Sequence, residues 1–247
     1  MAGVTLFVSD LHLSGERPDI TALFIDFLGR EAAQADALYM LGDIFEYWIG
    51  DEAVNWPEYR PVIAALSALT RVGVPLYLMH GNRDFLMGAG LEKATGGKLL
   101  DDPTHVSLYG TDALLMHGDS LCTRDTEYMK FRIMVRNPKW QKEFLARSVE
   151  ERDAIARNYR ELSKANGKMK PMDIMDVTPE AVEETLRAQK VRQLIHGHTH
   201  RPATHKLTID GQPATRIVLG DWYEQGSVLR CTKQGCDLAS IPLPTTM

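Results

Sequence analysis

Five short apolar runs recur along the chain, and each of them ends in polar residues that can bind metal ions. The runs are VTLFVSDLH (4–12), ALYMLGD (37–43), PLYLMHGN (75–82), ALLMHGD (113–119) and QLIHGHTH (193–200). Their length and their β-branched and aromatic residues predict buried strands. Helical patterns lie between them at 20–35, 60–73 and 179–190. This alternation predicts an α/β fold, in which ligands gather at the carboxyl ends of strands.

Seven side chains at the ends of these runs can coordinate a metal ion. Residues two apart on an extended chain point to the same side, so Asp10 can act with His12, and His198 with His200. Mixed imidazole, carboxylate and amide donors suit manganese, iron or zinc better than calcium or magnesium. Seven ligands exceed the need of one ion, which predicts a centre of two ions. The candidates are Asp10, His12, Asp43, Asn82, His117, His198 and His200.

The stretch HGNRDFL (80–86) adds a cation to these ligands. Gly81 allows the backbone to turn, Asn82 offers a neutral oxygen to a site rich in anions, and Arg83 supplies a planar cation. A permanent cation beside metal ligands suits an anionic substrate, and we expect a phosphate. The alternative is a surface arginine held near Asp84.

Length and composition set limits on the class of protein. A chain of 247 residues with 44% hydrophobic and 25% charged residues fits one large globular domain, with or without an insertion. The N-terminal run has no basic region before it, so we expect a buried strand and not a signal peptide. Arg71 and Gly73 interrupt the longest apolar stretch, so we expect no membrane span. Cys122, Cys231 and Cys236 cannot all pair, and we expect reduced thiols in a cytoplasmic protein.

Residues 124–170 differ from the rest of the chain in charge. They carry a net charge of +6 in a chain of −5, so the remainder carries −11. The segment has helical patterns with a break at Asn137-Pro138, and it interleaves apolar and aromatic side chains with lysine and arginine. It fits a lid, an amphipathic helical pair docked on the core, or a surface for single-stranded nucleic acid. Because it lies between two metal-bearing runs, we favour a lid at 124–170 on a core of 1–123 and 171–247.

In their order, the five runs match the signature of calcineurin-like metallophosphoesterases: D-x-H, G-D, G-N-[HR]-[DE], a histidine and G-H-x-H. Within that superfamily the chain resembles the UDP-2,3-diacylglucosamine hydrolase family over nearly its whole length. The closer resemblance rests on LGDIFEYWIGD, HGNRDFL, MHGDSLCTRD, SKANGKMKPMDIMDV and IHGHTHRP.

That resemblance implies an α/β sandwich with two central sheets and a helical lid insertion. It also implies that two manganese ions per chain support hydrolysis of UDP-2,3-diacylglucosamine to UMP and an acylated sugar 1-phosphate in lipid A biosynthesis. The family is attached peripherally to the cytoplasmic face of the inner membrane, where an anionic lipid surface would be the second partner. We expect no nucleic acid and no obligate protein partner.

Matching positions receive roles by the same resemblance. One ion would be held by Asp10, His12, Asp43 and His200, and the other by Asp43, Asn82, His117 and His198, so that Asp43 bridges the two. Substrate contacts would come from Asn82, Arg83, Asp125, Ser163, Gly167, Lys170 and His198. The compared family has a polar residue at the position of Gly167, which makes Asn166 and Lys168 alternatives for that contact. Arg83 and Asp43 would take part in catalysis.

Three classes of function fit these patterns, and a lipid-linked diphosphate hydrolase leads. A metallophosphoesterase for soluble nucleotides, phosphoproteins or nucleic acid is the second, and fast ester cleavage with weak diphosphatase turnover would distinguish it. A binding module that has lost catalysis is the third, and the intact ligand set argues against it.

Overall fold

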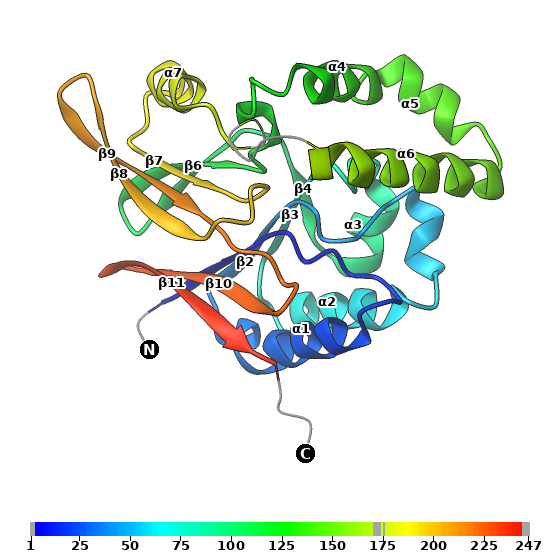
Figure 1. Cartoon of the computed structure of the whole chain (residues 1–247). Helices are drawn as coiled ribbons and strands as arrows, with labels where there is room; N and C mark the ends of the chain where they lie inside the picture. Colours follow the sequence, from blue (N-terminus) through cyan, green and yellow to red (C-terminus); the bar gives the residue numbers. More distant parts are fainter. Residues whose placement is uncertain (1–2, 170–173, 175, 244–247) are drawn as a thin grey trace.

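Two β-sheets form the centre of the molecule in the computed structural model, which describes residues 3–169, 174 and 176–243 (Figure 1). In spatial order the first sheet contains β11 (Gly235–Pro242), β10 (Gln225–Thr232), β1 (Thr5–Val8), β2 (Ala37–Leu41), β3 (Leu76–Met79) and β4 (Lys98–Leu100). The second contains β5 (Thr104–Leu108), β6 (Thr111–Met116), β7 (Gln193–His196), β9 (Gln212–Val218) and β8 (Ala203–Ile209). Strands β1 to β4 are parallel, as are β6, β7 and β9, which confirms the predicted α/β fold.

Seven helices surround the two sheets in the described part of the chain. They are α1 (Pro18–Arg30), α2 (Arg60–Arg71), α3 (Ala89–Thr95), α4 (Thr126–Val135), α5 (Pro138–Leu145), α6 (Val149–Met169) and α7 (Pro179–Gln189), with 3₁₀ turns at Ala32–Gln34, Asp51–Asn55 and Asp119–Leu121. Helices α1, α2 and α3 pack on the first sheet, and α7 packs on the second. A third apolar cluster fills the space between the sheets and joins residues such as Phe7 and Met79 to Leu115 and Ile195. The layers are therefore helix, sheet, sheet and helix.

Local sequence signals explain several of these boundaries. Helix α7 begins after Thr178 with Pro179 in its first turn, where a missing N–H costs nothing. The β8–β9 hairpin turns at Asp210-Gly211, and both residues have the positive φ that such a tight turn requires. The break between α4 and α5 falls at Asn137-Pro138, as predicted.

Helices α4, α5 and α6 lie outside the four layers, although Phe144 of α5 packs into the core of the first sheet. They form one group over the edge of the sheets where β1, β2, β3, β6 and β7 end (Figure 1). Among the described residues, no helix combines the length and the apolar character needed to cross a bilayer.

The expectation of reduced thiols is wrong for two of the three cysteines. Cys231 of β10 and Cys236 of β11 form a disulfide. The hairpin register places them directly opposite each other, with Cα atoms 4.1 Å apart. That proximity depends on the pairing register of two strands, which cysteine counting did not consider.

Candidate metal centre

The loops after β1, β2 and β7 bring the first group of candidate ligands together. His12 Nε2 lies 3.4 Å from His200 Nε2 and 3.7 Å from Asp43 Oδ2. His200 Nε2 lies 3.4 Å from Asp10 Oδ1. The ligand atoms of Asp10, His12 and His200 therefore converge within 4.8 Å of one another, and Asp43 Oδ2 lies beside His12, so the structure brings together the four side chains that the family resemblance assigns to one ion.

The second group forms beside the first and includes the loop after β3. Asn82 Oδ1 lies 2.9 Å from His117 Nε2 and 2.8 Å from His198 Nδ1. His117 Nε2 is also 3.8 Å from Asp43 Oδ1. Asp43 thus presents Oδ1 to the second group and Oδ2 to the first, which is the arrangement expected of a bridging ligand.

Strained backbone aims these side chains. Eight described residues other than glycine have positive φ, and five of them are the candidates Asp10, His12, Asp43, His198 and His200. That conformation is uncommon for residues with a Cβ atom and is typical of functional sites. Gly81 is required for space and not for a positive φ, because a Cβ atom there would collide with Asp43 Oδ1 and with the backbone nitrogen of Asp43.

Neighbouring groups hold the ligands in orientation. His117 Nδ1 lies 2.9 Å from the carbonyl oxygen of Leu41, and His200 Nδ1 lies 3.1 Å from Asp221 Oδ2. Both partners accept an N–H from Nδ1 and leave the Nε2 lone pair for a metal, as is usual around histidine ligands. The hydroxyl of Ser9 donates to Asp10 Oδ2 at 2.6 Å, so that Asp10 Oδ1 faces the centre.

The electrostatics of the centre fit bound cations. Two imidazole nitrogens face each other at 3.4 Å in the first group, and the buried Asp10 Oδ1 has no hydrogen-bond donor among the described residues. Burial opposes a charge on His200, yet the negative charges of the nearby Asp10 and Asp221 raise its pKa to about 10. His117 behaves alike, because Asp43 and other carboxylates outweigh burial and raise its pKa to about 9. Without a metal, these carboxylates recruit protons onto their histidines, so the donor set suits divalent cations.

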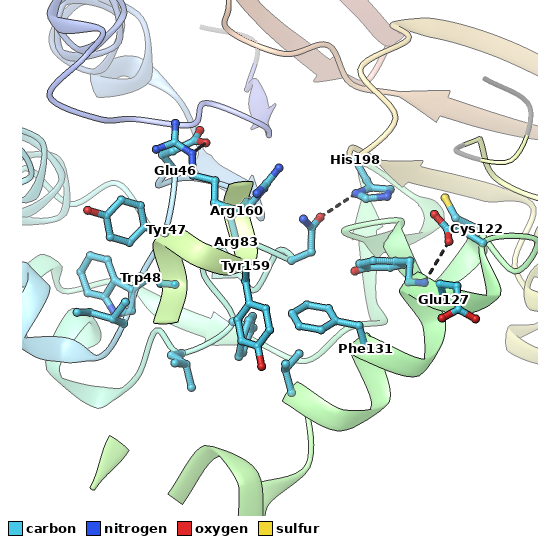
Figure 2. A pocket seen from close by; sticks show the side chains of 18 of the residues that line it. Glu46, Tyr47, Trp48, Arg83, Cys122, Glu127, Phe131, Tyr159, Arg160 and His198 are labelled. Atoms are coloured by element: carbon cyan, nitrogen blue, oxygen red, sulfur yellow. Dashed lines mark hydrogen bonds and ion pairs between the residues drawn. The ribbon is translucent and has the colours of Figure 1, made fainter. Parts of the chain in front are cut away.

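A cavity of about 620 Å³ adjoins the centre (Figure 2). Asn82, His198 and His200 line its end at the metal centre. The opposite wall is aromatic and aliphatic and comes from α4, α5, α6 and the loops after β2 and β3. Its apolar residues are Trp48, Ile49, Phe85, Leu86, Phe131, Val135, Trp140, Phe144 and Ala156.

Arg83 lines this cavity at the side nearest to Glu46 and Arg160 (Figure 2). Its backbone N–H donates to Asp43 Oδ1 at 2.8 Å, while its side-chain Nε is buried without a hydrogen-bond partner among the described residues. The alternative of a surface arginine held by Asp84 is wrong. The carboxylate of Asp84 accepts the backbone N–H groups of Gly81 and Ile44, at 2.8 and 2.7 Å, and forms no ion pair with Arg83.

Comparison with known proteins agrees with this geometry. The model of the family described as calcineurin-like phosphoesterase matches residues 4–202, a range that contains all seven candidate ligands. The chain belongs to this family.

Curated relatives of this phosphoesterase are named UDP-2,3-diacylglucosamine hydrolase. The protein from Marinobacter nauticus is 54% identical and covers 93% of each chain. The one from Chromohalobacter salexigens is 56% identical over 88% of each chain. The one from Pseudomonas entomophila is 53% identical over 95% of this chain and 97% of its own. The phosphoesterase is a hydrolase of this group.

The sequence did not predict the contacts that α4 makes with the core of the phosphoesterase. Asp119, buried two residues after His117, accepts hydrogen bonds from the Tyr128 hydroxyl at 2.5 Å and from Arg132 Nε at 2.8 Å. The ring of Tyr128 stacks on His198 with centroids 6.0 Å apart. Asp119 is the last residue of the HGD motif, so the sequence could have marked it as a candidate. Its partners Tyr128 and Arg132 lie on α4, and no motif predicts where that helix packs.

Sequence-predicted substrate residues of the phosphoesterase fall in three places. Asn82, Arg83, Asp125 and His198 line the cavity, and Asp125 also caps α4 by accepting the N–H of Tyr128 at 3.1 Å. Ser163, Asn166, Gly167 and Lys168 belong to α6, whose side chains are described only as far as Glu161. Lys170 lies outside the described residues.

Proposed function

We propose that this phosphoesterase hydrolyses the diphosphate bond of UDP-2,3-diacylglucosamine and releases UMP and 2,3-diacylglucosamine 1-phosphate. The observation that carries the proposal is a single cavity with a polar end at the metal centre and an apolar wall under α4, α5 and α6. A diphosphate with acyl chains on one side has the same division of polar and apolar parts. The name of these relatives, UDP-2,3-diacylglucosamine hydrolase, supports this choice among lipid-linked diphosphates.

Two manganese ions per chain are the proposed cofactors. Asp10, His12, Asp43 and His200 would hold one ion, and Asp43, Asn82, His117 and His198 the other. When bound, the ions activate the attacking water and neutralise charge on the phosphate. Support comes from the two converging groups of donors and from the orientation of the two oxygens of Asp43.

Arg83 is the proposed electrostatic clamp on the substrate. Water attack at the UMP-side phosphorus expels a sugar phosphate, whose second pKa of roughly 6 allows it to leave as an anion at neutral pH. Such a leaving group needs charge neutralisation more than a proton, and a guanidinium provides a permanent, bidentate cation. The buried Nε of Arg83, which has no hydrogen-bond partner in the part of the chain that the structure describes, is consistent with this role.

Residues 124–170 act in this proposal as a lid that receives the acyl chains. Asp125, Ser163, Lys170 and one of Asn166, Gly167 or Lys168 are proposed to contact the substrate from the lid. Phe131, Val135 and Phe144 offer apolar surface to the cavity, and each CH₂ buried there contributes about 0.8 kcal/mol.

The proposal places the phosphoesterase on the cytoplasmic face of the inner membrane as a peripheral protein. Ile133, Met134 and Leu145 are exposed on α4 and α5, although most large apolar side chains are buried. Lysines such as Lys130 and Lys139 lie on the same helices. Exposed apolar residues beside basic ones suit an anionic lipid surface.

A product analysis tests the proposal. The protein is incubated with UDP-2,3-diacylglucosamine and Mn²⁺ in H₂¹⁸O, and the products are resolved by mass. We expect UMP that carries one ¹⁸O and unlabelled 2,3-diacylglucosamine 1-phosphate. Label in the sugar phosphate would contradict attack at the UMP side. Fast cleavage of soluble phosphate esters with weak diphosphatase turnover would instead favour a substrate without acyl chains.

A further inference from the structure

Glu46, in the loop after β2, is a buried carboxylate with two partners of different kinds. Its Oε2 lies 3.3 Å from Nδ1 of His12, the proposed metal ligand after β1. Its Oε1 forms an ion pair with Nε of Arg160 on α6 at 2.7 Å. The side chain of Glu46 is only 8% exposed, and those of His12 and Arg160 are 3% and 19% exposed. One carboxylate therefore touches both the metal centre and the helix above the cavity.

The backbone fixes Glu46 opposite His12. The loops after β1 and β2 continue to pair beyond the sheet, because the N–H of His12 donates to the carbonyl of Asp43, and the N–H of Leu13 to that of Ile44, both at 3.0 Å. The N–H of Glu46 returns a bond to Leu13 at 3.0 Å. This pairing places the carboxylate beside the imidazole without help from the lid.

An ordinary salt bridge that attaches α6 is the plain alternative. Helix α6 already has such an attachment, because the buried Arg152 pairs with Glu52 at 2.8 Å and donates to the carbonyl of Ile49 at 2.7 Å. Within the described ranges, no hydrogen bond or ion pair joins Arg152, Glu52 or Ile49 to a candidate metal ligand. Attachment of α6 does not require Glu46 to contact His12, so this contact needs another explanation.

We propose that Glu46 is a positioning residue that couples the first metal group to α6. Its Oε2, 3.3 Å from Nδ1 of His12, attracts that side of the ring and so turns Nε2 toward the metal, while its Oε1 holds the guanidinium of Arg160 at the cavity wall beside Arg83. A metal that fixes His12 thereby also fixes Arg160. The inference rests on the proposed metal centre, but it concerns the link between that centre and the lid.

Titration of the metal-free full-length protein with Mn²⁺ alone tests the first half. Glu46→Gln keeps the shape and removes the charge, and we expect a dissociation constant for one of the two ions raised by roughly 10–100-fold, the usual cost of losing an outer partner of a metal ligand. Glu16→Gln is the matched control. Glu16 approaches the same Arg160 at 3.7 Å from solvent, with its side chain 77% exposed, and no hydrogen bond or ion pair joins it to His12 in the described part of the chain. Equal Mn²⁺ affinity in Glu46→Gln, Glu16→Gln and the parent would overturn the proposal.

Amide hydrogen exchange tests the second half, again without substrate. In the parent, Mn²⁺ should slow exchange in α6, and in Glu46→Gln this metal-dependent protection should be lost while Glu16→Gln retains it. Arg160→Gln should lose the protection too, yet bind Mn²⁺ within about threefold of the parent. If Mn²⁺ still slowed amide exchange of α6 in Glu46→Gln, the Glu46–Arg160 contact would be an ordinary salt bridge and the coupling would be refuted.

Glu46→Asp is the second variant if Glu46→Gln fails to fold. The shorter carboxylate keeps its charge and cannot reach both partners, so we expect either weaker Mn²⁺ binding or lost protection of α6. Parental behaviour in both measurements would overturn the coupling. Both readouts are independent of UMP release, so failure here is distinguishable from failure of the proposed function.

Discussion

The ligand-bearing strand ends and the helices above them are held in place by different means. At the strand ends, the backbone itself sets direction, through positive φ at residues such as Asp10 and His200 and through the close approach of Gly81 to Asp43. Helices α4, α5 and α6 are attached through side chains, such as Arg132 on Asp119, and through their apolar faces.

This difference separates the two tasks of the molecule. Backbone geometry tolerates few alternatives, so the strand ends can hold metal ligands with the accuracy that coordination requires. Side-chain attachments allow more variation in sequence and position, so the helices can shape a cavity for a particular substrate. We therefore expect changes at the strand ends to affect every substrate, and changes on the helices to affect the acylated one.

Removal of Asp43, the proposed ligand of both ions, should lower activity more than any other change considered. Asp43→Ala removes a ligand from both groups, so we expect the protein to lose both ions. Turnover of any phosphate ester should then fall by more than the roughly 10–100-fold that is usual when a hydrogen-bond partner of a metal ligand is removed. His200→Ala should weaken mainly one ion. Metal content and turnover are measured on the purified proteins. An Asp43→Ala enzyme with parental activity would refute the two-ion centre.

A charge introduced into the apolar wall of the cavity should distinguish the role of the helices from that of the strand ends most clearly. Phe131→Asp places a carboxylate against the acyl chains, and we expect a loss of about 1.5–3 kcal/mol or more in kcat/KM on the diacylated substrate, the value of burying one large apolar side chain. Thr126→Asp is the matched control on α4, because that side chain is exposed and does not line the cavity. Cleavage of bis(p-nitrophenyl) phosphate should remain unchanged in both. Equal losses on the two substrates would show that Phe131 serves the fold alone.

Arg83 lies where the two regions meet, and its removal should have an intermediate effect. Arg83→Ala should cost roughly 1.5–3 kcal/mol of transition-state stabilisation, the scale of a hydrogen bond to a charged group. Arg83→His should not restore the diphosphatase rate, because histidine lacks a permanent, bidentate charge. The measurement is kcat/KM on the diphosphate and on an unactivated alkyl phosphodiester. A histidine variant that matches the parent on the diphosphate would exclude the clamp.

The two regions also differ in how far the sequence predicts them. Each strand end has a local signature, a short apolar run followed by glycine and polar residues, so the fold class and the residues that converge at the strand ends could be predicted. The pairs Glu46–Arg160 and Asp119–Arg132 have no such signature, because each depends on how a helix docks in three dimensions. The Cys231–Cys236 disulfide was missed for a related reason, since it depends on strand register.

The smallest expected effect concerns the stability of the helices themselves. Asn137 caps α5, and its side chain accepts the N–H of Lys139 at 2.9 Å just before Pro138. Asn137→Ala removes that acceptor, and we expect α5 to lose about 1 kcal/mol, the typical value of an N-cap.

Local opening of α5 should therefore become about fivefold more frequent, a change that amide exchange in residues 139–145 would detect. Asn137→Asp keeps the acceptor and is the control. Because the strand ends are held by their own backbone, Mn²⁺ affinity and cleavage of bis(p-nitrophenyl) phosphate should not change in either variant. A fall in Mn²⁺ affinity for Asn137→Ala alone would show that α5 supports the metal centre, and the division between backbone-held ligands and side-chain-held helices would then fail at this helix.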